Sequence, residues 1–261
     1  MFEEERKQMI VNYVQSKSRV SVQELCKLLD VSESTIRRDL SDLEDQKMLK
    51  RTHGGALDLR SVNFEPTYSE KEDQFKEEKA RIAKKAAEFI QDGDSLIIDA
   101  GTTTFYLAEE LTKFRGLTVV TNSIPLMQKL STIPDIEIVA TGGSLRKNTM
   151  AFTGPLSETV LDHIHVDKAF IGTNGLDIEA GLTTPNVQEA SSKQKMISIA
   201  NKVYVLVDHS KIGRVSFARF GRIVDIDACI TSAAVTEEQR TIFESNHIQL
   251  YIADKEYPAE S

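Results

Sequence analysis

Residues 32–44 read Ser-Glu-Ser-Thr-Ile-Arg-Arg-Asp-Leu-Ser-Asp-Leu-Glu, a segment that combines a helix-capping serine with an amphipathic helix. The Ser32 hydroxyl can cap a helix that begins just after it, and Ile36, Leu40 and Leu43 recur at helical spacing. If these three side chains face a core, the opposite face of the helix points outward. That outward face carries Glu33, Ser34, Arg37, Arg38 and Ser41.

Two helices are predicted before this segment and a hairpin after it. Residues 3–16 carry apolar side chains at helical spacing, and Ser21 with Glu24 forms a capping-box pattern that opens a second, short helix. Residues 49–56 combine a β-like run with a pair of glycines, which predicts a hairpin. Three helices and a hairpin within sixty residues predict a winged helix-turn-helix.

The charges of this part of the chain fit DNA. Arginine forks and short hydroxyls suit base edges and phosphates when a helix enters the major groove, and a cationic hairpin would contact the DNA backbone. The cations of the hairpin are Lys50, Arg51 and His53. The alternative is a solvated helix in which Arg37 and Arg38 pair with Asp39 and Asp42.

Overall charge does not by itself suggest a nucleic-acid partner, because the net charge is −8 over 261 residues. Residues 1–60 hold 11 basic and 11 acidic residues, so the whole deficit lies in residues 61–261. The two cysteines are far apart and form no metal or redox motif, and no apolar run is long enough to span a bilayer. We therefore expect a reduced cytoplasmic protein without membrane contact.

The rest of the chain has a different pattern. Residues 58–74 are polar and predict a linker, although a helix is expected to begin near Ser69 and to continue through Phe89. Short β-rich runs then alternate with helical segments, which predicts a mostly parallel α/β domain over residues 75–261. The strand candidates are 95–99, 117–121, 136–140, 168–172, 203–207, 228–231 and 248–252.

Polar turns follow several of these strands. Asp99-Ala100-Gly101-Thr102-Thr103-Thr104 is a glycine and hydroxyl turn between a strand and a helix, an arrangement that attracts anions. Ligands of open parallel sheets bind beyond the carboxyl ends of the strands, so these turns together predict one small anionic ligand. The other turns are 121–123, 141–144 and 208–211.

The segment 32–44, followed by Leu49-x-Arg51-x-His53-Gly54-Gly55-Ala56, resembles the DNA-binding signature of the DeoR-type bacterial repressors. The resemblance implies that the third helix and the hairpin contact a double-stranded operator. It assigns Ser34, Thr35, Arg37 and Arg38 to the helix contact and Arg51 and His53 to the wing. Residues 1–57 would then form the DNA-binding domain, and residues 75–261 an effector-binding and oligomerisation domain that pairs protomers into a homodimer or homotetramer.

Residues 75–261 resemble the sugar-phosphate-binding domain that DeoR-type repressors share in fold with ribose-5-phosphate isomerase. The resemblance implies phosphate at residues 101–104, sugar hydroxyls near Asp99, Asn122 and Glu189, and a positive charge from Lys211. Fructose 1-phosphate is the first effector to test. The further candidates for effector contact are Gly142, Gly143, Arg146, Lys147 and Asp208.

Several alternatives stay open at this point. Lys193 lies four residues after Glu189, so a helical ion pair between them is the simpler expectation. His163 and His165 have a spacing that could bind metal, but no third ligand is evident, so neither a metal nor a cofactor is expected. His209 could sense occupancy of the ligand loop. The functional alternatives to a repressor are a sugar-phosphate isomerase with a regulatory helix-turn-helix and a constitutive DNA-binding protein.

Overall fold

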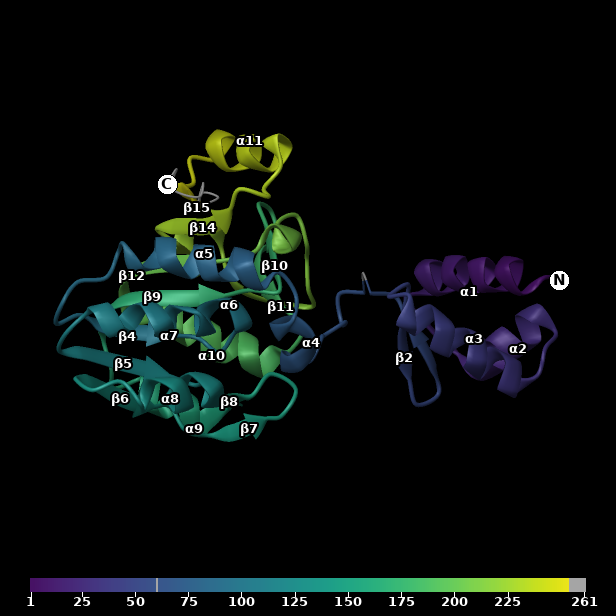
Figure 1. Cartoon of the computed structure of the whole chain (residues 1–261), viewed down its shortest axis with the longest axis horizontal. Helices are drawn as coiled ribbons and strands as arrows, with labels where there is room; N and C mark the ends of the chain where they lie inside the picture. Colours follow the sequence, from purple (N-terminus) through teal and green to yellow (C-terminus); the bar gives the residue numbers. More distant parts are fainter. Residues whose placement is uncertain (60, 254–261) are drawn as a thin grey trace, which may run out of the picture. The chain divides into compact units, whose positions relative to one another are not determined.

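The computed structural model describes residues 1–59 and 61–253, and their contacts divide the chain into two compact units. The first unit runs from Met1 to Phe64 and the second begins at Glu65 (Figure 1). None of the helices within the described residues combines the length and the apolar character needed to cross a bilayer.

The first unit contains the predicted helices α1 (Glu3–Lys17), α2 (Val22–Leu29) and α3 (Glu33–Asp45). The capping box that begins α2 is present: the Glu24 amide donates to the Ser21 hydroxyl over 3.1 Å, and the Ser21 amide donates to the Glu24 carboxylate over 2.7 Å. Ser32 caps α3 by accepting a hydrogen bond from the Thr35 amide. The local sequence therefore sets where both helices begin.

A buried apolar cluster joins the three helices. Ile10, Leu25, Ile36 and Leu40 are at most 1% exposed and pack together. Truncation of one such side chain to alanine costs about 2–5 kcal/mol in comparable cores. The face of α3 predicted to be apolar is thus the face that the unit buries.

The hairpin consists of β2 (Lys50–Thr52) and β3 (Gly55–Leu57). An additional strand that the sequence pattern did not predict, β1 (Arg19–Ser21), pairs with β3 and completes a sheet of order β1-β3-β2. At Gly55 a Cβ atom would lie 1.9 Å from the Val20 carbonyl oxygen, so only glycine allows β3 to approach β1 this closely.

The second unit is built on a seven-stranded, fully parallel sheet of order β15-β14-β12-β9-β4-β5-β6 (Figure 1). Each strand matches one of the seven predicted runs, with ends that differ by up to three residues. The strands are β4 (Ser95–Ile98), β5 (Leu117–Thr121), β6 (Ile136–Ala140), β9 (Val166–Gly172), β12 (Ala200–Leu206), β14 (Ala228–Ser232) and β15 (Leu250–Ala253).

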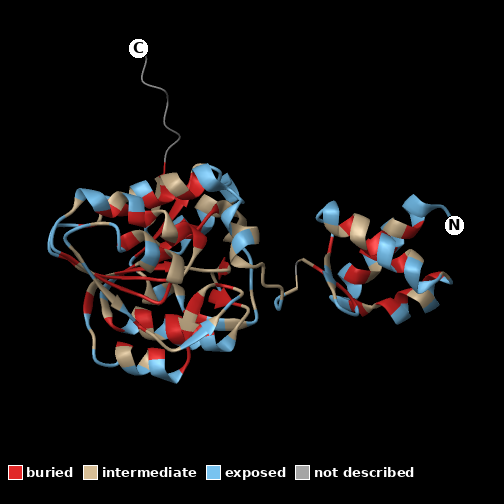
Figure 2. Cartoon of the chain, turned by 60° about the horizontal axis from the view of Figure 1, so that its bottom comes forward, coloured by how far each residue is buried: buried red, intermediate tan, exposed pale blue. Residues whose placement is uncertain are grey.

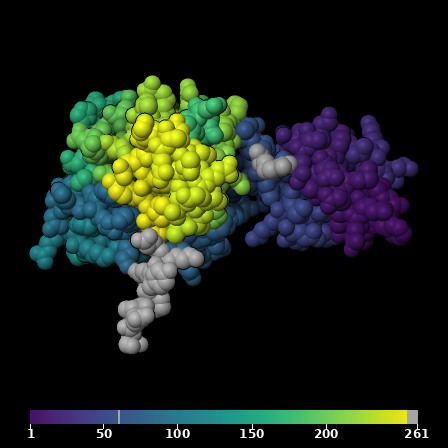
Figure 3. Space-filling view, turned by 90° about the horizontal axis from the view of Figure 1, so that it is seen from above, coloured from purple at the N-terminus to yellow at the C-terminus, as the bar shows by residue number. Residues whose placement is uncertain are grey.

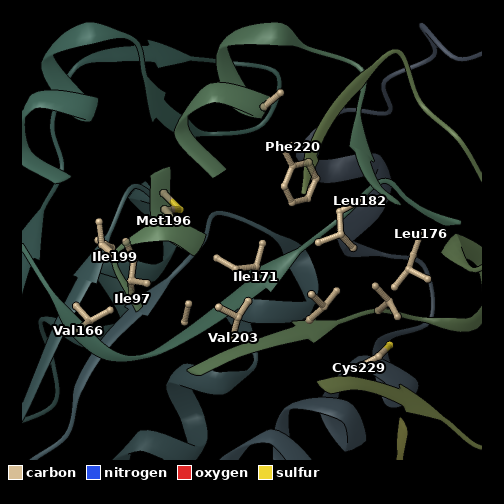
Figure 4. Close-up of a cluster of buried hydrophobic side chains, with 14 of the residues drawn as sticks. Ile97, Val166, Ile171, Leu176, Leu182, Met196, Ile199, Val203, Phe220 and Cys229 are labelled. Carbon is tan, nitrogen blue, oxygen red and sulfur yellow. The ribbon is translucent and has the colours of Figure 1, made fainter. Parts of the chain in front are cut away.

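Helices cover both faces of this sheet, as the continuous apolar strands predict. On one face, Ile97 and Ile171 pack with Met196 of α10 (Val187–Ser198), and Figure 4 shows Ile171, Val203 and Phe220 among the side chains of this cluster. The opposite face is covered by α5 (Lys76–Ala87), α7 (Leu107–Glu110) and α8 (Ile124–Leu130). Figure 2 shows the strands of the sheet mostly buried and the helices exposed on their outer sides.

Smaller elements surround the sheet. A hairpin of β7 (Ser144–Arg146) and β8 (Ala151–Thr153) precedes α9 (Pro155–Leu161). A second small sheet contains β10 (Gly175–Asp177), β11 (Gly181–Thr184) and β13 (Ala218–Gly221). The helix α11 (Glu237–Ser245) and the edge strand β15 form the yellow region of the surface in Figure 3.

The single helix expected from Ser69 to Phe89 was wrong. The chain instead forms a short helix, α4 (Tyr68–Glu72), and then α5. The break lies at Phe75, whose φ of 54° is in the left-handed region and cannot continue a right-handed helix. The Thr67 hydroxyl caps α4. Part of the predicted linker is therefore structured and belongs to the second unit.

Candidate functional site

The outward face of α3 carries the cations predicted to meet DNA. Ser34, Arg37 and Arg38 are exposed, whereas Thr35 is half-buried, and its hydroxyl lies 3.0 Å from the capping Ser32 oxygen. The Arg37 guanidinium lies 3.4 Å from Glu33, one turn earlier. Such exposed pairs contribute little, so a phosphate or a base edge can displace this contact.

The alternative pairing of Arg37 and Arg38 with Asp39 and Asp42 is not what the structure shows. Asp39 is buried and accepts two hydrogen bonds from the Arg6 guanidinium of α1, at 2.5 and 3.0 Å. Asp42 forms an ion pair with Lys7 of the same helix, at 2.7 Å. Both carboxylates therefore hold α1 against α3 and do not neutralise the outward arginines.

The hairpin cations lie beside α3. Arg51 donates to the Ser41 hydroxyl over 2.9 Å, and Lys50 lies 3.3 Å from Glu44. His53 is exposed at the tip of the hairpin. These contacts hold the hairpin against α3, and its tip is exposed to solvent.

The second unit contains a polar cavity at the carboxyl ends of β12, β9 and β4, which are adjacent in the sheet. Six of the residues predicted from the sequence line it: Gly101, Thr102, Thr103, Glu189, Asp208 and Lys211. The first turn of α6 (Thr102–Phe105) leaves its amides without partners inside the helix. These amides and the threonine hydroxyls are donors suited to an anion.

Other predicted residues shape this region without lining the cavity. The Asn122 side chain accepts a hydrogen bond from the Ala100 amide at 2.8 Å, which holds the loop before Gly101. The Thr104 hydroxyl is fully buried and donates to the Asp99 carbonyl at 2.7 Å. Both residues therefore fix the geometry of the glycine and threonine loop.

Gly142, Gly143 and Lys147 lie outside the cavity lining. The strand order explains this placement, because β6 is at the edge of the sheet and β9 lies between β4 and β12. The end of β9 and the turn after it take the place expected for the turn after β6, and they supply Gly172, Thr173 and Asn174 to the lining.

Asp99 lies at the base of the site and is 1% exposed. Its carboxylate accepts a hydrogen bond from the Gly172 amide at 3.1 Å and forms an ion pair with Lys193. Burial raises the pKa of the Asp99 carboxyl, and the Lys193 ammonium opposes that shift. The expected Glu189–Lys193 helical ion pair was therefore wrong, because the buried carboxylate takes the lysine.

Glu189 has other partners. Its carboxylate lies 2.6 Å from the Arg146 guanidinium, and it accepts hydrogen bonds from the hydroxyls of Thr149 and Thr184. Glu189 lines the cavity and Arg146 does not, so Arg146 is linked to the cavity through this ion pair.

Three lysines that line the cavity were not among the predicted site residues: Lys71 of α4, Lys79 of α5 and Lys193 of α10. Lys79 is 2% exposed, and burial lowers its pKa to about 8. A sequence signal existed for Lys79, because it precedes Ile82 and Ala86 by three and seven residues and so lies on the apolar stripe of α5. With Lys211, four lysines surround a small cavity.

His209 packs edge-on against the Phe75 ring, with ring centroids 4.9 Å apart, and its Nδ1 lies 3.0 Å from the Glu78 carboxylate. Glu78, Asp208 and His209 place potential metal-ligand atoms within 4.8 Å of one another, a grouping that the sequence pattern did not indicate. Glu78 already accepts hydrogen bonds from Ser232 and the His209 amide. His163 and His165 do not belong to this group.

Comparison with known proteins gives the family. Residues 6–62 match the DeoR-like helix-turn-helix domain, and residues 74–233 match the DeoR C terminal sensor domain. The HTH-type transcriptional regulator GlpR of Haloferax volcanii is 42% identical over 245 residues, which cover 94% of this chain and 96% of that protein. The Glycerol-3-phosphate regulon repressor of Escherichia coli is 35% identical over 251 residues, which cover 96% of this chain and 99% of that protein.

A further relative and one solved structure were also compared with the chain. The uncharacterized HTH-type transcriptional regulator FruR of Bacillus subtilis is 41% identical and covers 89% of this chain and 92% of its own. Ribose 5-phosphate isomerase from Plasmodium falciparum is 19% identical over 52% of each chain, with a TM-score of 0.39, a level that adds nothing to the assignment. On its two domain matches and its full-length relatives, the chain belongs to the DeoR family of helix-turn-helix transcription regulators.

Proposed function

We propose that this protein represses a sugar-catabolism operon and is released from its double-stranded operator when a phosphorylated sugar binds the cavity of the second unit. The observation that carries this proposal is the convergence of four lysines and the Gly101–Thr103 loop on one cavity. An anionic ligand of small size is the chemistry that such a cavity attracts. In this proposal the first unit binds DNA, and the second unit binds the effector and joins protomers into a homodimer or homotetramer in the cytoplasm.

The phosphate is assigned to the loop. Thr102 and Thr103 supply hydroxyls and amides, and the ammonium groups of Lys71, Lys79 and Lys211 supply charge. Glu189 also lines the cavity, and its carboxylate can accept hydrogen bonds from sugar hydroxyls. Fructose 1-phosphate remains the first compound to test. The name of the Escherichia coli relative refers to glycerol 3-phosphate, another small phosphorylated polyol, which belongs in the same panel.

An isomerase function is less well supported. Moving a proton between adjacent carbons needs a carboxylate that can act as a base over the ligand. The candidate bases are Asp99, Glu189 and Asp208. Asp99 and Glu189 are each already held by a cation, Lys193 and Arg146 respectively. Asp208 accepts hydrogen bonds from the Ser210 amide and hydroxyl and lies 4.0 Å from the Lys211 ammonium. The relatives described above are named as transcription regulators.

A thermal-shift screen against sugar phosphates tests the proposal. A ligand present at 100 times its dissociation constant adds about 2.7 kcal/mol to stability, which a melting curve resolves. A constitutive DNA-binding protein whose second unit only oligomerises would show no shift with any member of the panel. A turnover assay with the compound that binds would detect an isomerase.

A further inference from the structure

The cavity is connected to the start of the second unit by a chain of charged side chains. The Arg146 guanidinium forms two hydrogen bonds with the Glu65 carboxylate, at 3.0 and 2.8 Å, and lies 2.6 Å from Glu189. Glu65 is the first residue of the second unit, and Glu189 lines the cavity. One arginine therefore bridges a cavity residue and the point where the chain leaves for the DNA-binding unit.

Hydrogen bonds to Asn148, in the loop that follows Arg146, also hold Glu65 and the residues after it. Asn148 donates to the Glu65 carboxylate at 2.8 Å, and the Tyr68 amide donates to the Asn148 carbonyl at 2.7 Å. We call residues 65–74 the strap. Its first half is held by the β7–β8 hairpin loop through these bonds and the Arg146 pair.

The second half of the strap forms part of the cavity wall. Lys71 and Gln74 line the cavity, and α4 packs against α6, which carries the threonines of the loop. The Lys71 carbonyl accepts a hydrogen bond from the Lys79 ammonium. Among the described residues, no carboxylate forms an ion pair with Lys71. Burial lowers the pKa of Lys71, and the Glu189 and Glu65 carboxylates oppose that shift. A phosphate in the cavity would supply a closer counter-charge and favour the protonated form.

We propose that the strap reads the occupancy of the cavity through Lys71 and through the Glu189–Arg146–Glu65 relay, and passes it along the chain toward the DNA-binding unit. A phosphate draws Lys71 toward the loop, and a sugar hydroxyl at Glu189 competes with Arg146 for that carboxylate. Arg146 then redistributes between its two partners, which changes how firmly Glu65 is held. This inference rests on the proposed function for its ligand, whereas the relay itself can be tested without one.

The relay is tested by hydrogen exchange of the full-length protein without ligand. Glu189→Gln keeps the shape of the side chain and removes the charge that positions Arg146. The hydrogen-bond partners of Glu189 are Thr149, Thr184 and Asn186, which lie outside the strap. We expect backbone amides of the strap, the Tyr68 amide above all, to exchange at least about fivefold faster, the lower end of typical coupling between sites. Glu65→Gln should have the same effect from the other end.

The matched control is Asp94→Asn. Asp94 pairs with Lys168 at the amino ends of β4 and β9, so this variant loses a largely buried ion pair of the same sheet without touching the relay. Strap exchange should stay at the wild-type rate. If Glu65→Gln accelerates strap exchange and Glu189→Gln does not, the relay does not reach the cavity, and the proposal is overturned. If Asp94→Asn accelerates strap exchange as much as these variants, the effect is not specific to the relay, and the proposal is also overturned.

Fructose 1-phosphate then separates the two proposals. Binding of this probe should change strap exchange in the wild type and change it less in Glu65→Gln. By reciprocity of coupling, Glu65→Gln should also alter the affinity for the probe although Glu65 lies outside the cavity lining. If no sugar phosphate shifts the melting curve while Glu189→Gln still loosens the strap, the proposed effector class fails and the relay stands.

Discussion

The Lys193 ammonium pairs with the carboxylate of Asp99, ninety-four residues away in sequence, and not with Glu189 one turn earlier on its own helix. Lys193 also donates to the Gly172 carbonyl at 2.9 Å and lies 5.5 Å from the centre of the Phe220 ring. The pair thus ties α10 to the carboxyl ends of β4 and β9. It fixes the base of the cavity and leaves Glu189 to Arg146.

Lys193→Met should destabilise the second unit by about 3–5 kcal/mol, because it leaves a buried carboxylate without its counter-charge. Without the ammonium, the raised pKa of Asp99 rises further, so the folded variant binds a proton that the unfolded chain releases. The stability of the variant therefore falls as pH rises above about 4, the ordinary range of an aspartate. Urea unfolding at several pH values measures this dependence.

The control for that measurement is Lys195→Met, which removes a more exposed pair with Asp162 from the same helix. It should change the unfolding free energy by less than about 1 kcal/mol. Equal losses in the two variants would show that the Lys193–Asp99 pair has no special role.

Lys79 predicts a pH dependence of ligand binding. With a pKa near 8, its ammonium is charged at neutral pH and loses its proton on mild alkalinisation. The affinity for fructose 1-phosphate should therefore fall as pH rises through about 8, and calorimetric titrations from pH 7 to 9 measure it. Lys79→Met should bind more weakly at pH 7 and show a flatter profile, whereas Lys76→Met, on the exposed side of α5, should keep the wild-type profile.

The same lysine affects stability with a definite sign. Its folded pKa of about 8 lies below the ordinary value of 10.5, so between these values the unfolded chain binds more protons. Lys79 therefore makes the ligand-free protein more stable as pH rises through this window. A wild-type curve that rises no more than that of Lys79→Met would contradict the assignment.

We expect the arginines of α3 to determine the affinity and the base preference of operator binding. Arg37→Ala and Arg38→Ala should each weaken operator binding, and loss of a base contact should cost about 1–3 kcal/mol and relax the preference at one base pair. Loss of a phosphate contact should instead weaken all sequences alike. Fluorescence anisotropy with operator fragments and their single-base variants separates the two, with Lys17→Ala on α1 as the control. Wild-type affinity in both arginine variants would remove α3 as the recognition helix.

Much of the architecture was predictable because its signals are local. The capping residues Ser21 and Ser32 set the starts of α2 and α3, and short β-rich runs marked all seven strands of the parallel sheet. The three-residue strand β1 could not be found, since it exists only by pairing with β3 across more than thirty residues. Very short strands carry too few side chains for a periodic pattern.

The cavity was predictable only in part for a related reason. Turns after strands can be identified from sequence, but the order of strands decides which turns meet, and β9 rather than β6 borders β4. Lys71 comes from a segment whose polar sequence predicts a linker. In the structure this segment forms the separate helix α4, which the break at Phe75 divides from α5. Side chains brought in by such tertiary contacts leave no mark on local spacing.

The phosphate loop predicts a separation of functions. Thr102→Ala combined with Thr103→Ala should leave operator binding intact and abolish the response to the sugar phosphate, which gives a repressor that is no longer released. Thr112→Ala serves as the control, because Thr112 lies outside the cavity lining and its hydroxyl donates to the Glu109 carbonyl. A double variant that still responds normally would show that the phosphate binds elsewhere.

Operator affinity measured with and without a sugar phosphate shows whether occupation of the cavity releases the DNA. Gel shifts of the wild-type protein across a fructose 1-phosphate series, extended to the compound that gives the largest thermal shift, should show operator affinity falling about 5–150-fold, the range of typical coupling energies. A compound that binds the cavity, raises the melting temperature and leaves operator affinity unchanged would contradict the account.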